Sequence, residues 1–465
     1  MSDLLLTHGY ILAEDEKEQE IMRPYPPLGI LYISAYLKDL GFSVEIHDPT
    51  MGRRSELENR LVRDAATVLG IYTTMMTRAS VLRIAARANA LGWTVVVGGP
   101  DAGNYAAEYL EHGAHVVVRG EGEETLRELL ETLPRRGPHR LQGIRGITFS
   151  DEEGRAVANP GRALIADLDS LPLPDREAID IDAYLDVWKT HHGMGSVNLI
   201  TSRGCAYRCN WCSHAVFGHS HRRRSAVGAA DEVESIVRRY DPDQLWYSDD
   251  VFTISRKWLR TFALELDRRG IHRPFETITR ADRMKGDEVV RTLAELGCYR
   301  VWIGAESGSQ RILDAMDRGV TTDEIDWAVS AAKRAGIETG LFLMWGYEGE
   351  QFEDVEATVE FVSRVQPDIF FTTLAYPIKD TGYYRKVEDR VVRPGPWAEI
   401  SDREHGVRGR PGREHFRPAD RWLRAAAEAA SLTRSDPPRA NELEEEAALA
   451  KEEFREACHR FEAES

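Results

Sequence analysis

Two stretches of this 465-residue chain alternate short apolar segments with amphipathic ones, and this alternation constrains the fold more than any other feature. The apolar segments are rich in Val, Ile and Leu, which is typical of strands that are buried on both faces. Strands that alternate with helices form parallel sheets with helices on both sides. We therefore expect an α/β protein, and a chain of this length needs more than one hydrophobic core.

The first stretch, residues 1–135, predicts a doubly wound, Rossmann-like parallel sheet. Ligands of such open sheets bind at the carboxyl ends of the strands. Glycines at these ends let the backbone approach a ligand closely, although turns require the same glycines. The predicted strands are Asp3–Thr7, Ser43–His47, Thr67–Tyr72, Thr94–Val97 and His115–Val118. The candidate ligand residues behind them are Thr73, Thr74, Gly98, Gly99 and Gly120.

Residues 136–190 predict a linker, because proline and glycine recur in them. Proline restricts the residue before it to extended conformations, so repeated prolines indicate extended chain. The segments that carry this signal are Gly137-Pro138, Asn159-Pro160-Gly161 and Leu171-Pro172-Leu173-Pro174.

The second alternating stretch, residues 191–390, contains six strand–helix units. A closed TIM barrel has eight such units, so we predict an open, partial barrel of the TIM type. Residues 391–465 predict a helical C-terminal region, with helical spacing in Pro418–Leu432 and Glu442–Ala463. The predicted barrel strands are Val197–Thr201, Gln244–Tyr247, Glu276–Thr279, Tyr299–Gly304, Glu338–Met344 and Ile369–Leu374.

The charge and hydropathy of the chain exclude several classes of protein. The net charge of −17 argues against a general nucleic-acid binder and against a protein that binds anionic membrane surfaces. No apolar run is long enough to span a membrane. Acidic residues such as Asp15 and Glu16 interrupt the N-terminal region, where a signal peptide needs an unbroken apolar stretch. These features predict a cytoplasmic protein.

Three of the five cysteines crowd into the segment Cys205-Ala206-Tyr207-Arg208-Cys209-Asn210-Trp211-Cys212. In a reducing compartment such spacing is typical of a metal site. Three thiolates can hold three irons of a [4Fe–4S] cluster and leave the fourth iron open to another ligand. The alternative is a structural zinc site that takes its fourth ligand from His214, His219 or His221.

The spacing Cys-x₃-Cys-x-aromatic-Cys directly after a strand resembles the motif of the radical S-adenosylmethionine (SAM) superfamily, with Trp211 as the aromatic residue. Further segments resemble the ends of that family's second to fifth barrel strands, namely Tyr247–Phe252, Thr279–Asp282, Ile303–Ser309 and Leu343–Glu350. The first stretch, with Gly98-Gly99-Pro100 and Arg119–Glu123, resembles the cobalamin-binding domain of one subgroup. That subgroup includes cobalamin-dependent methylases and the anaerobic magnesium-protoporphyrin ester cyclase.

The resemblance implies that the three clustered cysteines hold a [4Fe–4S] cluster and that SAM binds its open iron. Asp249 and Asp250 would accept hydrogen bonds from the SAM ammonium group, although a pair that caps a helix is the other interpretation. Arg280 would pair with the SAM carboxylate as a planar fork. A surface ion pair with Asp282 is the alternative for this arginine.

The resemblance also implies contacts to the rest of SAM. Glu306 would bind the ribose hydroxyl groups, and Ser307 would assist it. Gly346 would let the adenine lie against the backbone, and Trp211 would pack beside the cluster or the adenine. These residues bind and orient the cofactor, which itself supplies the chemistry.

Cobalamin is implied for the first stretch, with its nucleotide tail along the five candidate ligand residues from Thr73 to Gly120. Many cobalamin domains carry an Asp-x-His-x-x-Gly motif whose histidine binds cobalt. This chain lacks that motif, and the radical SAM subgroup commonly lacks it too.

Together, these resemblances imply a cobalamin-dependent radical SAM methyltransferase. It would methylate an unactivated carbon of a small natural product through a 5′-deoxyadenosyl radical and methylcobalamin. One alternative keeps the same cofactors but performs oxidation, cyclisation or ring rearrangement, and another is a non-catalytic Cys₃His zinc scaffold. The expected partners are a small-molecule substrate and an electron donor such as flavodoxin or ferredoxin.

Overall fold

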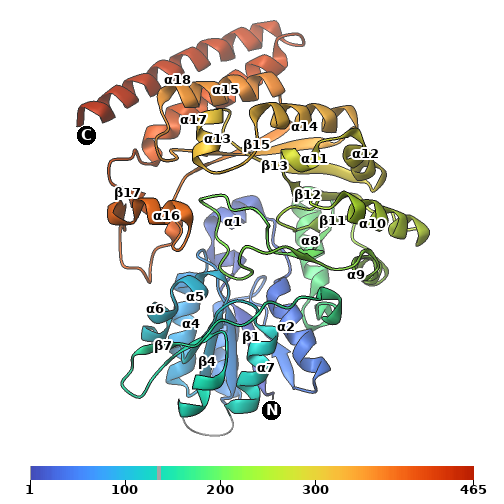
Figure 1. Cartoon of the computed structure of the whole chain (residues 1–465), viewed down its shortest axis with the longest axis vertical. Coiled ribbons are helices and arrows are strands. Elements are labelled where there is room, and N and C mark those ends of the chain that lie inside the picture. Colours follow the sequence, from blue (N-terminus) through green and yellow to red (C-terminus); the bar gives the residue numbers. More distant parts are fainter. Residues whose placement is uncertain (1, 134–137, 465) are drawn as a thin grey trace. The chain divides into compact units, whose positions relative to one another are not determined.

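The computed structural model describes residues 2–133 and 138–464 and divides into two compact units (Figure 1). The first unit comprises residues 1–206, 213–246 and 395–402, and the second comprises residues 207–212, 247–394 and 403–465. The predicted boundary between residues 135 and 136 lies outside the described residues.

The first sheet has seven strands. They are β1 (Leu4–His8), β2 (Val44–Ile46), β3 (Val68–Tyr72), β4 (Thr94–Gly98), β5 (Val116–Val118), β6 (Ile147–Ser150) and β7 (Ala156–Ala158). Their order is β2-β1-β3-β4-β5-β6-β7, and β1 to β5 pair in parallel, as predicted. The order reverses between β1 and β3, and sheets of this type bind ligands outside the strand ends at the reversal.

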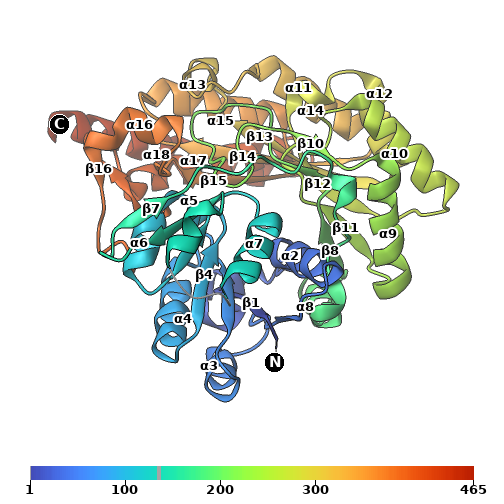
Figure 2. The same cartoon turned by 60° about the horizontal axis from the view of Figure 1, so that its bottom comes forward.

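Helices cover both faces of this sheet (Figure 2). On one face lie α2 (Leu28–Asp39) and α7 (Glu123–Thr132), and on the other lie α3 (Arg54–Arg63), α4 (Arg78–Ala90), α5 (Pro100–Asn104) and α6 (Ala106–Glu111). The short helix α1 (Glu16–Ile21) has no buried residues. Successive strand residues point to opposite faces, so Leu5 packs with Val81 of α4, whereas Leu4 and Leu6 pack with Ile30 of α2. Two apolar layers therefore enclose the parallel strands, which explains their near-continuous apolar sequences.

The predicted linker, residues 136–190, contains more structure than expected. Its strands β6 and β7 extend the first sheet in antiparallel fashion, and β6 pairs with β5. Helix α8 (Ile181–His192) follows, with Asp180 capping its first turn. Proline-rich chain does occur between β7 and α8, at Pro160, Pro172 and Pro174. The two short strands form because β5 offers an unpaired edge, which local sequence does not reveal.

The second sheet has six strands in the open order β8-β11-β12-β13-β14-β15, which confirms the predicted partial barrel. The strands are β8 (Ser196–Leu199), β11 (Gln244–Tyr247), β12 (Phe275–Thr279), β13 (Cys298–Glu306), β14 (Glu338–Trp345) and β15 (Ile369–Leu374). Strands β12 to β15 pair in parallel. The helices between these strands are α9 (Ala226–Tyr240), α10 (Arg256–Arg268), α11 (Ala281–Met284), α12 (Asp287–Glu295), α13 (Gln310–Ala315), α14 (Thr322–Arg334) and α15 (Phe352–Val365).

The C-terminal region is helical, as predicted. After α16 (Gly382–Val387) and the short antiparallel pair β16 (Val391–Val392) and β17 (Gly406–Val407), the helices α17 (Arg417–Leu432) and α18 (Pro437–Glu464) complete the chain. The rings of Trp422 and Phe454 both stack on Phe352 of α15, which joins these helices to the second unit. Within the described part of the chain, none of the helices combines the length and the apolar character that crossing a bilayer requires.

Candidate functional site

The three clustered cysteines lie on the loop between β9 (Ser202–Arg203) and β10 (Arg222–Arg223), two short antiparallel strands. Cys205 is half-buried, Cys209 is buried and Cys212 is exposed, and none of them forms a disulfide. Across residues 2–133 and 138–464, no three His, Cys, Asp or Glu side chains already converge on one point that could hold a metal ion. The groups that surround the cysteines therefore indicate whether they fit a cluster.

Residues 207–212 are anchored in the second unit by Asn210. Its backbone N–H donates to the Met316 carbonyl at 3.0 Å, and its own carbonyl accepts from the Tyr383 N–H at 2.7 Å. The approach to α16 is close, because a Cβ at Gly382 would lie 2.8 Å from the Asn210 side-chain oxygen. The two C-terminal cysteines of the motif thus sit on a segment held from both sides.

The buried thiol of Cys209 faces two guanidinium groups. Nη1 of Arg280 and Nη1 of Arg318 each lie 3.7 Å from the Cys209 sulfur. Both arginine side chains are almost fully buried. Arg280 also pairs with Asp282 at 2.8 Å, and Arg318 lies 3.8 Å from Glu306. Their positive charges at the sulfur would in addition favour a negatively charged form of it. A metal-bound thiolate carries such charge, so these residues fit a cluster ligand at Cys209.

Arg280 follows β12, and all three nitrogens of its guanidinium group contact other groups of the protein. Its Nε donates to Asp282 Oδ1 at 2.8 Å, and its Nη2 donates to two backbone carbonyls. The guanidinium carbon lies 3.6 Å from the centre of the Tyr207 ring. The ion pair with Asp282 is therefore present, and Arg280 is buried in it. A carboxylate of SAM would have to compete with these contacts, which favour a role for Arg280 at the cysteine segment.

Glu306, at the end of β13, is buried and has a left-handed backbone conformation with φ of +63°. Non-glycine residues adopt this conformation rarely, mostly where structure or function requires it. Burial raises the pKa of Glu306, and the nearby Arg318 and Arg280 oppose that rise. Ser307 contacts Thr358 at 3.1 Å through its hydroxyl group and accepts a bond from a backbone N–H. Glu306 is therefore better placed than Ser307 to meet a ligand hydroxyl group.

Asp249 and Asp250 follow β11, as predicted, but differ in exposure: Asp249 is buried and Asp250 is exposed. Desolvation by the surrounding protein and the charge of Asp249 raise the pKa of Asp250. Neither residue caps α10, because the side chain of Ser255 does so by accepting from the Trp258 N–H. The helix-cap interpretation of this pair is therefore wrong. Trp211 is partly buried against the apolar cluster of the second unit that includes Tyr347.

Gly346 is required by close packing. Its φ is +67°, and a Cβ at this position would lie 2.9 Å from both the Leu374 and the Phe416 side chains. Its N–H donates to Glu350 Oε2 at 2.5 Å, and its carbonyl accepts from Arg410 at 2.9 Å. The space beside Gly346 is thus occupied by Phe416, and an adenine at this backbone would have to displace that ring.

We expect replacement of Glu350 by glutamine to stabilise the protein increasingly as the pH rises from 5 to 8. Glu350 Oε1 is buried without a hydrogen-bond partner among the described residues, and burial raises its pKa to about 8. Between the unfolded pKa, near 4.5, and 8, the folded protein keeps a proton that the unfolded chain releases, so stability falls as the pH rises. The advantage of Glu350→Gln over the native protein should grow by about 3–4 kcal/mol over this range.

Thermal unfolding at a series of pH values measures this difference. Glu353→Gln is the control, because Glu353 is exposed three residues further along the chain. A Glu350→Gln advantage that stayed constant with pH would show that Glu350 is ionised in the folded protein.

The predicted cobalamin residues lie at the carboxyl edge of the first sheet. Thr73 follows β3, Gly98 ends β4, and Gly120 lies two residues after β5, so all three adjacent strands contribute. Thr74, Gly98, Gly99 and Gly120 are half-buried, whereas Thr73 is fully buried. Four of the five positions are only partly buried, which is compatible with a nucleotide tail lying along this edge.

Thr73 and Gly99 determine how closely the loops at this edge pack. Thr73 Oγ1 lies 2.9 Å from the Tyr109 hydroxyl. Gly99 has a φ of +111°, and a Cβ there would lie 2.3 Å from the Thr73 carbonyl oxygen. Only glycine permits this approach of the loops after β3 and β4.

The end of the cysteine loop lies beside the same edge within the first unit. A Cβ at Gly103 would lie 3.8 Å from the Ala215 carbonyl oxygen, and one at Gly120 would lie 3.6 Å from that of Val216. Buried ion pairs hold the base of this loop. Arg203 of β9 donates to Glu121 at 2.8 Å and to Glu123 at 2.6 Å. Arg222 of β10 also donates to Glu121 at 2.8 Å. The loop that carries the cysteines is thereby tied to the end of β5.

Sequence reasoning missed several residues that build these sites. Arg318 lies in no motif, and nothing in its neighbours indicates that it reaches Cys209. Arg203 could have been found, because it stands two residues before the first motif cysteine. Glu121 and Glu123 lie in the glycine segment that the sequence singles out, where their charge suggests a basic partner.

Two protein families match the chain. The B12 binding domain matches residues 20–130, and the radical SAM superfamily matches residues 199–362. These domains make cobalamin, a [4Fe–4S] cluster and SAM the cofactors of the chain, as predicted.

Individual relatives match over most of their length. An uncharacterised methyltransferase of Pyrococcus horikoshii is 28% identical over 77% of this chain and 77% of its own. The anaerobic magnesium-protoporphyrin IX monomethyl ester cyclase of Rubrivivax gelatinosus is 26% identical over 80% of this chain and 68% of its own. The solved radical SAM methyltransferase TsrM of Kitasatospora setae, with cobalamin and a [4Fe–4S] cluster bound, has a TM-score of 0.70 at 20% identity over 87% of this chain and 82% of its own. This last likeness concerns the fold. The chain therefore belongs to the radical SAM superfamily, in the subgroup whose members carry a B12 binding domain before the radical SAM domain.

Proposed function

We propose that this protein is a cobalamin-dependent radical SAM methyltransferase that methylates an unactivated carbon of a small molecule. The observation that carries the proposal is the pair of buried guanidinium groups at the Cys209 sulfur, in a chain that also has a B12 binding domain. When bound, the cluster and SAM supply a 5′-deoxyadenosyl radical, and cobalamin supplies the methyl group. The methyltransferase relatives favour this outcome over other radical reactions.

The residues of the second unit would bind and orient SAM. Glu306 would accept hydrogen bonds from the ribose hydroxyl groups. Because Glu306 is buried, a ligand without these hydroxyl groups would leave its carboxylate unpaired, so the contact would be specific for ribose. Asp249 and Asp250 would accept from the ammonium group of SAM. Arg280 would meet the SAM carboxylate only by exchanging its contact with Asp282, and otherwise stabilises the cysteine segment.

A second function, a radical cyclase or oxidase with the same cofactors, is favoured by the similarity to the anaerobic cyclase of Rubrivivax gelatinosus. We also propose that a flavodoxin or ferredoxin delivers the electron, that nucleic acid is not a partner, and that the protein works in the cytoplasm. None of the five cysteines forms a disulfide in the described part of the chain, which agrees with a reducing compartment.

One anaerobic assay separates the two functions. The reconstituted protein is incubated with hydroxocobalamin, a reductant, candidate substrates and SAM that carries a trideuterated methyl group. A methyltransferase forms both 5′-deoxyadenosine and S-adenosylhomocysteine, and its product gains the deuterated methyl group. 5′-Deoxyadenosine together with a product of unchanged carbon count would overturn the methyltransferase proposal and support the cyclase or oxidase.

A further inference from the structure

The loop Gly395–Asp402 belongs to the first unit, although it lies almost three hundred residues after α6 in the chain. It packs against the apolar cluster that α4 and α6 form with one face of the first sheet. The Trp397 ring packs at 5.4 Å from that of Tyr105 and at 5.2 Å, edge-on, from that of Tyr109. Ala398 packs against the same apolar cluster. The contacts of this loop are therefore made with the B12 binding domain.

A single buried arginine connects this loop to the domain. Arg78, the first residue of α4, is 1% exposed. Its Nε and Nη2 donate to the two carboxylate oxygens of Asp101 at 2.8 and 2.6 Å. Nη2 also donates to Asp402 Oδ1 at 2.7 Å, and Nη1 donates to the Ile400 carbonyl at 2.9 Å. One guanidinium group thus joins α4, α5 and the distant loop.

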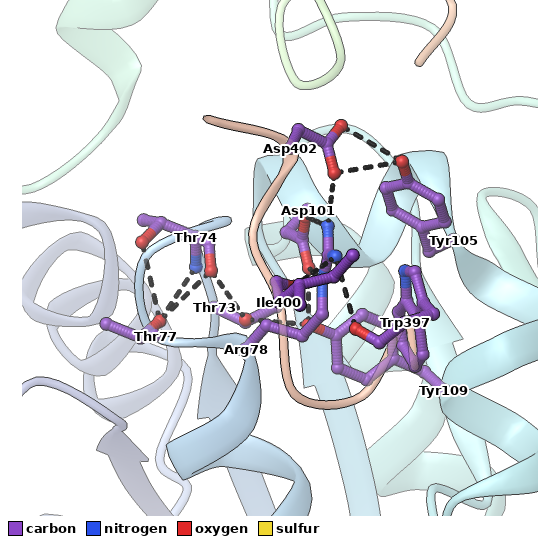
Figure 3. A network of polar contacts seen from close by, with 10 residues as sticks. All are labelled: Thr73, Thr74, Thr77, Arg78, Asp101, Tyr105, Tyr109, Trp397, Ile400 and Asp402. Atoms are coloured by element: carbon purple, nitrogen blue, oxygen red, sulfur yellow. Dashed lines mark hydrogen bonds and ion pairs between the residues drawn. The ribbon is translucent and has the colours of Figure 1, made fainter. Parts of the chain in front are cut away.

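Two tyrosines extend this network, and one of them, Tyr109, connects it to Thr73 (Figure 3). Tyr105 donates to both carboxylate oxygens of Asp402 at 2.9 Å. Tyr109 donates to Asp101 at 2.6 Å and contacts Thr73 Oγ1 at 2.9 Å. The loops after β3 and β4, which carry the predicted cobalamin residues, are thereby held by the same set of buried bonds as the distant loop.

The composition of the network favours one arrangement of these loops. A bidentate arginine–carboxylate pair fixes direction as well as distance. Arg78 Nη1 also donates to the Trp397 carbonyl at 3.4 Å. Removal of one of these partners leaves a charged or polar group with fewer hydrogen bonds in a dry environment. A partly docked loop is therefore unfavourable, and the three loops should dock together.

We propose that Arg78 and Asp402 are positioning residues of the cobalamin site: by docking the loop Gly395–Asp402 they fix the loops after β3 and β4 in the arrangement that accepts the nucleotide tail. This inference rests on the assignment of cobalamin to this edge. Because coupling between two sites is reciprocal, loop docking that favours cobalamin requires that cobalamin favours loop docking.

The first test uses the full-length native protein with hydroxocobalamin as the probe. Amide hydrogen exchange is compared between the free and the cobalamin-saturated protein. Exchange in the loop Gly395–Asp402 should slow on the order of tenfold when hydroxocobalamin binds. Unchanged exchange in this loop, in a protein that binds hydroxocobalamin, would overturn the inference.

The second test uses Asp402→Asn, which removes the carboxylate that pairs with Arg78 and leaves the Arg78–Asp101 pair intact. Its dissociation constant for hydroxocobalamin, from absorbance titration, should rise on the order of tenfold. Asp64→Asn is the matched control, since Asp64 also pairs with arginines of the first unit but at the exposed end of α3. The electron paramagnetic resonance spectrum of the cluster should be the same in both variants as in the native protein. A general folding defect would change this spectrum.

The possible outcomes distinguish failure of the positioning role of Asp402 from failure of the cobalamin assignment. If the native protein does not bind hydroxocobalamin, the cobalamin assignment fails. If the native protein binds it and Asp402→Asn binds it equally well, the assignment stands and the positioning role of Asp402 is refuted. A variant Asp402→Glu that regains the native affinity would tie the effect to the carboxylate.

Discussion

Replacement of Cys209 by alanine is expected to remove the iron–sulfur cluster and to abolish formation of 5′-deoxyadenosine. A cubane held by three thiolates has no spare protein ligand, so loss of one thiolate exposes a second iron to solvent and reductant. The replacement also leaves two buried guanidinium groups facing a methyl group where a sulfur had been. Both effects act in the same direction, so this variant should retain neither iron nor activity above background.

Anaerobic reconstitution followed by iron and sulfide analysis measures the cluster, and its absorbance near 400 nm reports it independently. Cys298→Ala is the matched control. Cys298 begins β13, is buried, and has its pKa raised by burial, so it remains a thiol and serves as a small apolar residue. Its replacement should leave the iron content unchanged. A Cys209→Ala protein that kept four irons would contradict the motif assignment, and bound zinc in place of iron would favour the alternative scaffold.

Much of the fold follows from local sequence, because the pattern of apolar residues in each strand indicates which of its faces are buried. Leu4, Leu5 and Leu6 are apolar in succession since both faces of β1 are covered, and the predicted strands of both sheets match the observed ones within a few residues. Helix α3 escapes prediction because only Leu57 and Leu61 of its ten residues are buried. The strands β6 and β7 escape it because their stability comes from the edge of β5 and not from their own sequences.

The residues of the candidate sites also differ in whether local sequence predicts them. Motifs identify the three cysteines, because the chemistry requires them at short spacing along the chain. No motif identifies Arg78 or Arg318, because each acts on partners that the chain brings together over long separations: Arg78 on Asp402, and Arg318 on Cys209. Such residues are found only when the fold is known, since arginine is common in this chain and most arginines pair at its surface.

Replacement of Arg318 by glutamine should lower the midpoint potential of the cluster by about 100 mV. Arg318 Nη1 lies 3.7 Å from the Cys209 sulfur, and the side chain is buried, so solvent screens its charge weakly. A unit charge roughly 6 Å from the irons, at an effective dielectric constant of about 20, favours the added electron by roughly 2–3 kcal/mol. For a one-electron couple, 100 mV reduces the fraction of reduced cluster roughly fifty-fold at a fixed donor potential.

A redox titration followed by electron paramagnetic resonance measures the midpoint directly, without substrate and without turnover. Arg318→Lys keeps a positive charge beside the sulfur and should recover most of the potential, which separates charge from packing. Arg311→Gln is the control for loss of an arginine in the same unit, because Arg311 pairs with Asp354 at a more exposed position. Equal potentials in the native and Arg318→Gln proteins would show that the guanidinium group only packs against Cys209. A fall that Arg318→Lys reverses would instead identify this arginine, invisible to any motif, as the residue that makes the cluster reducible by cellular donors.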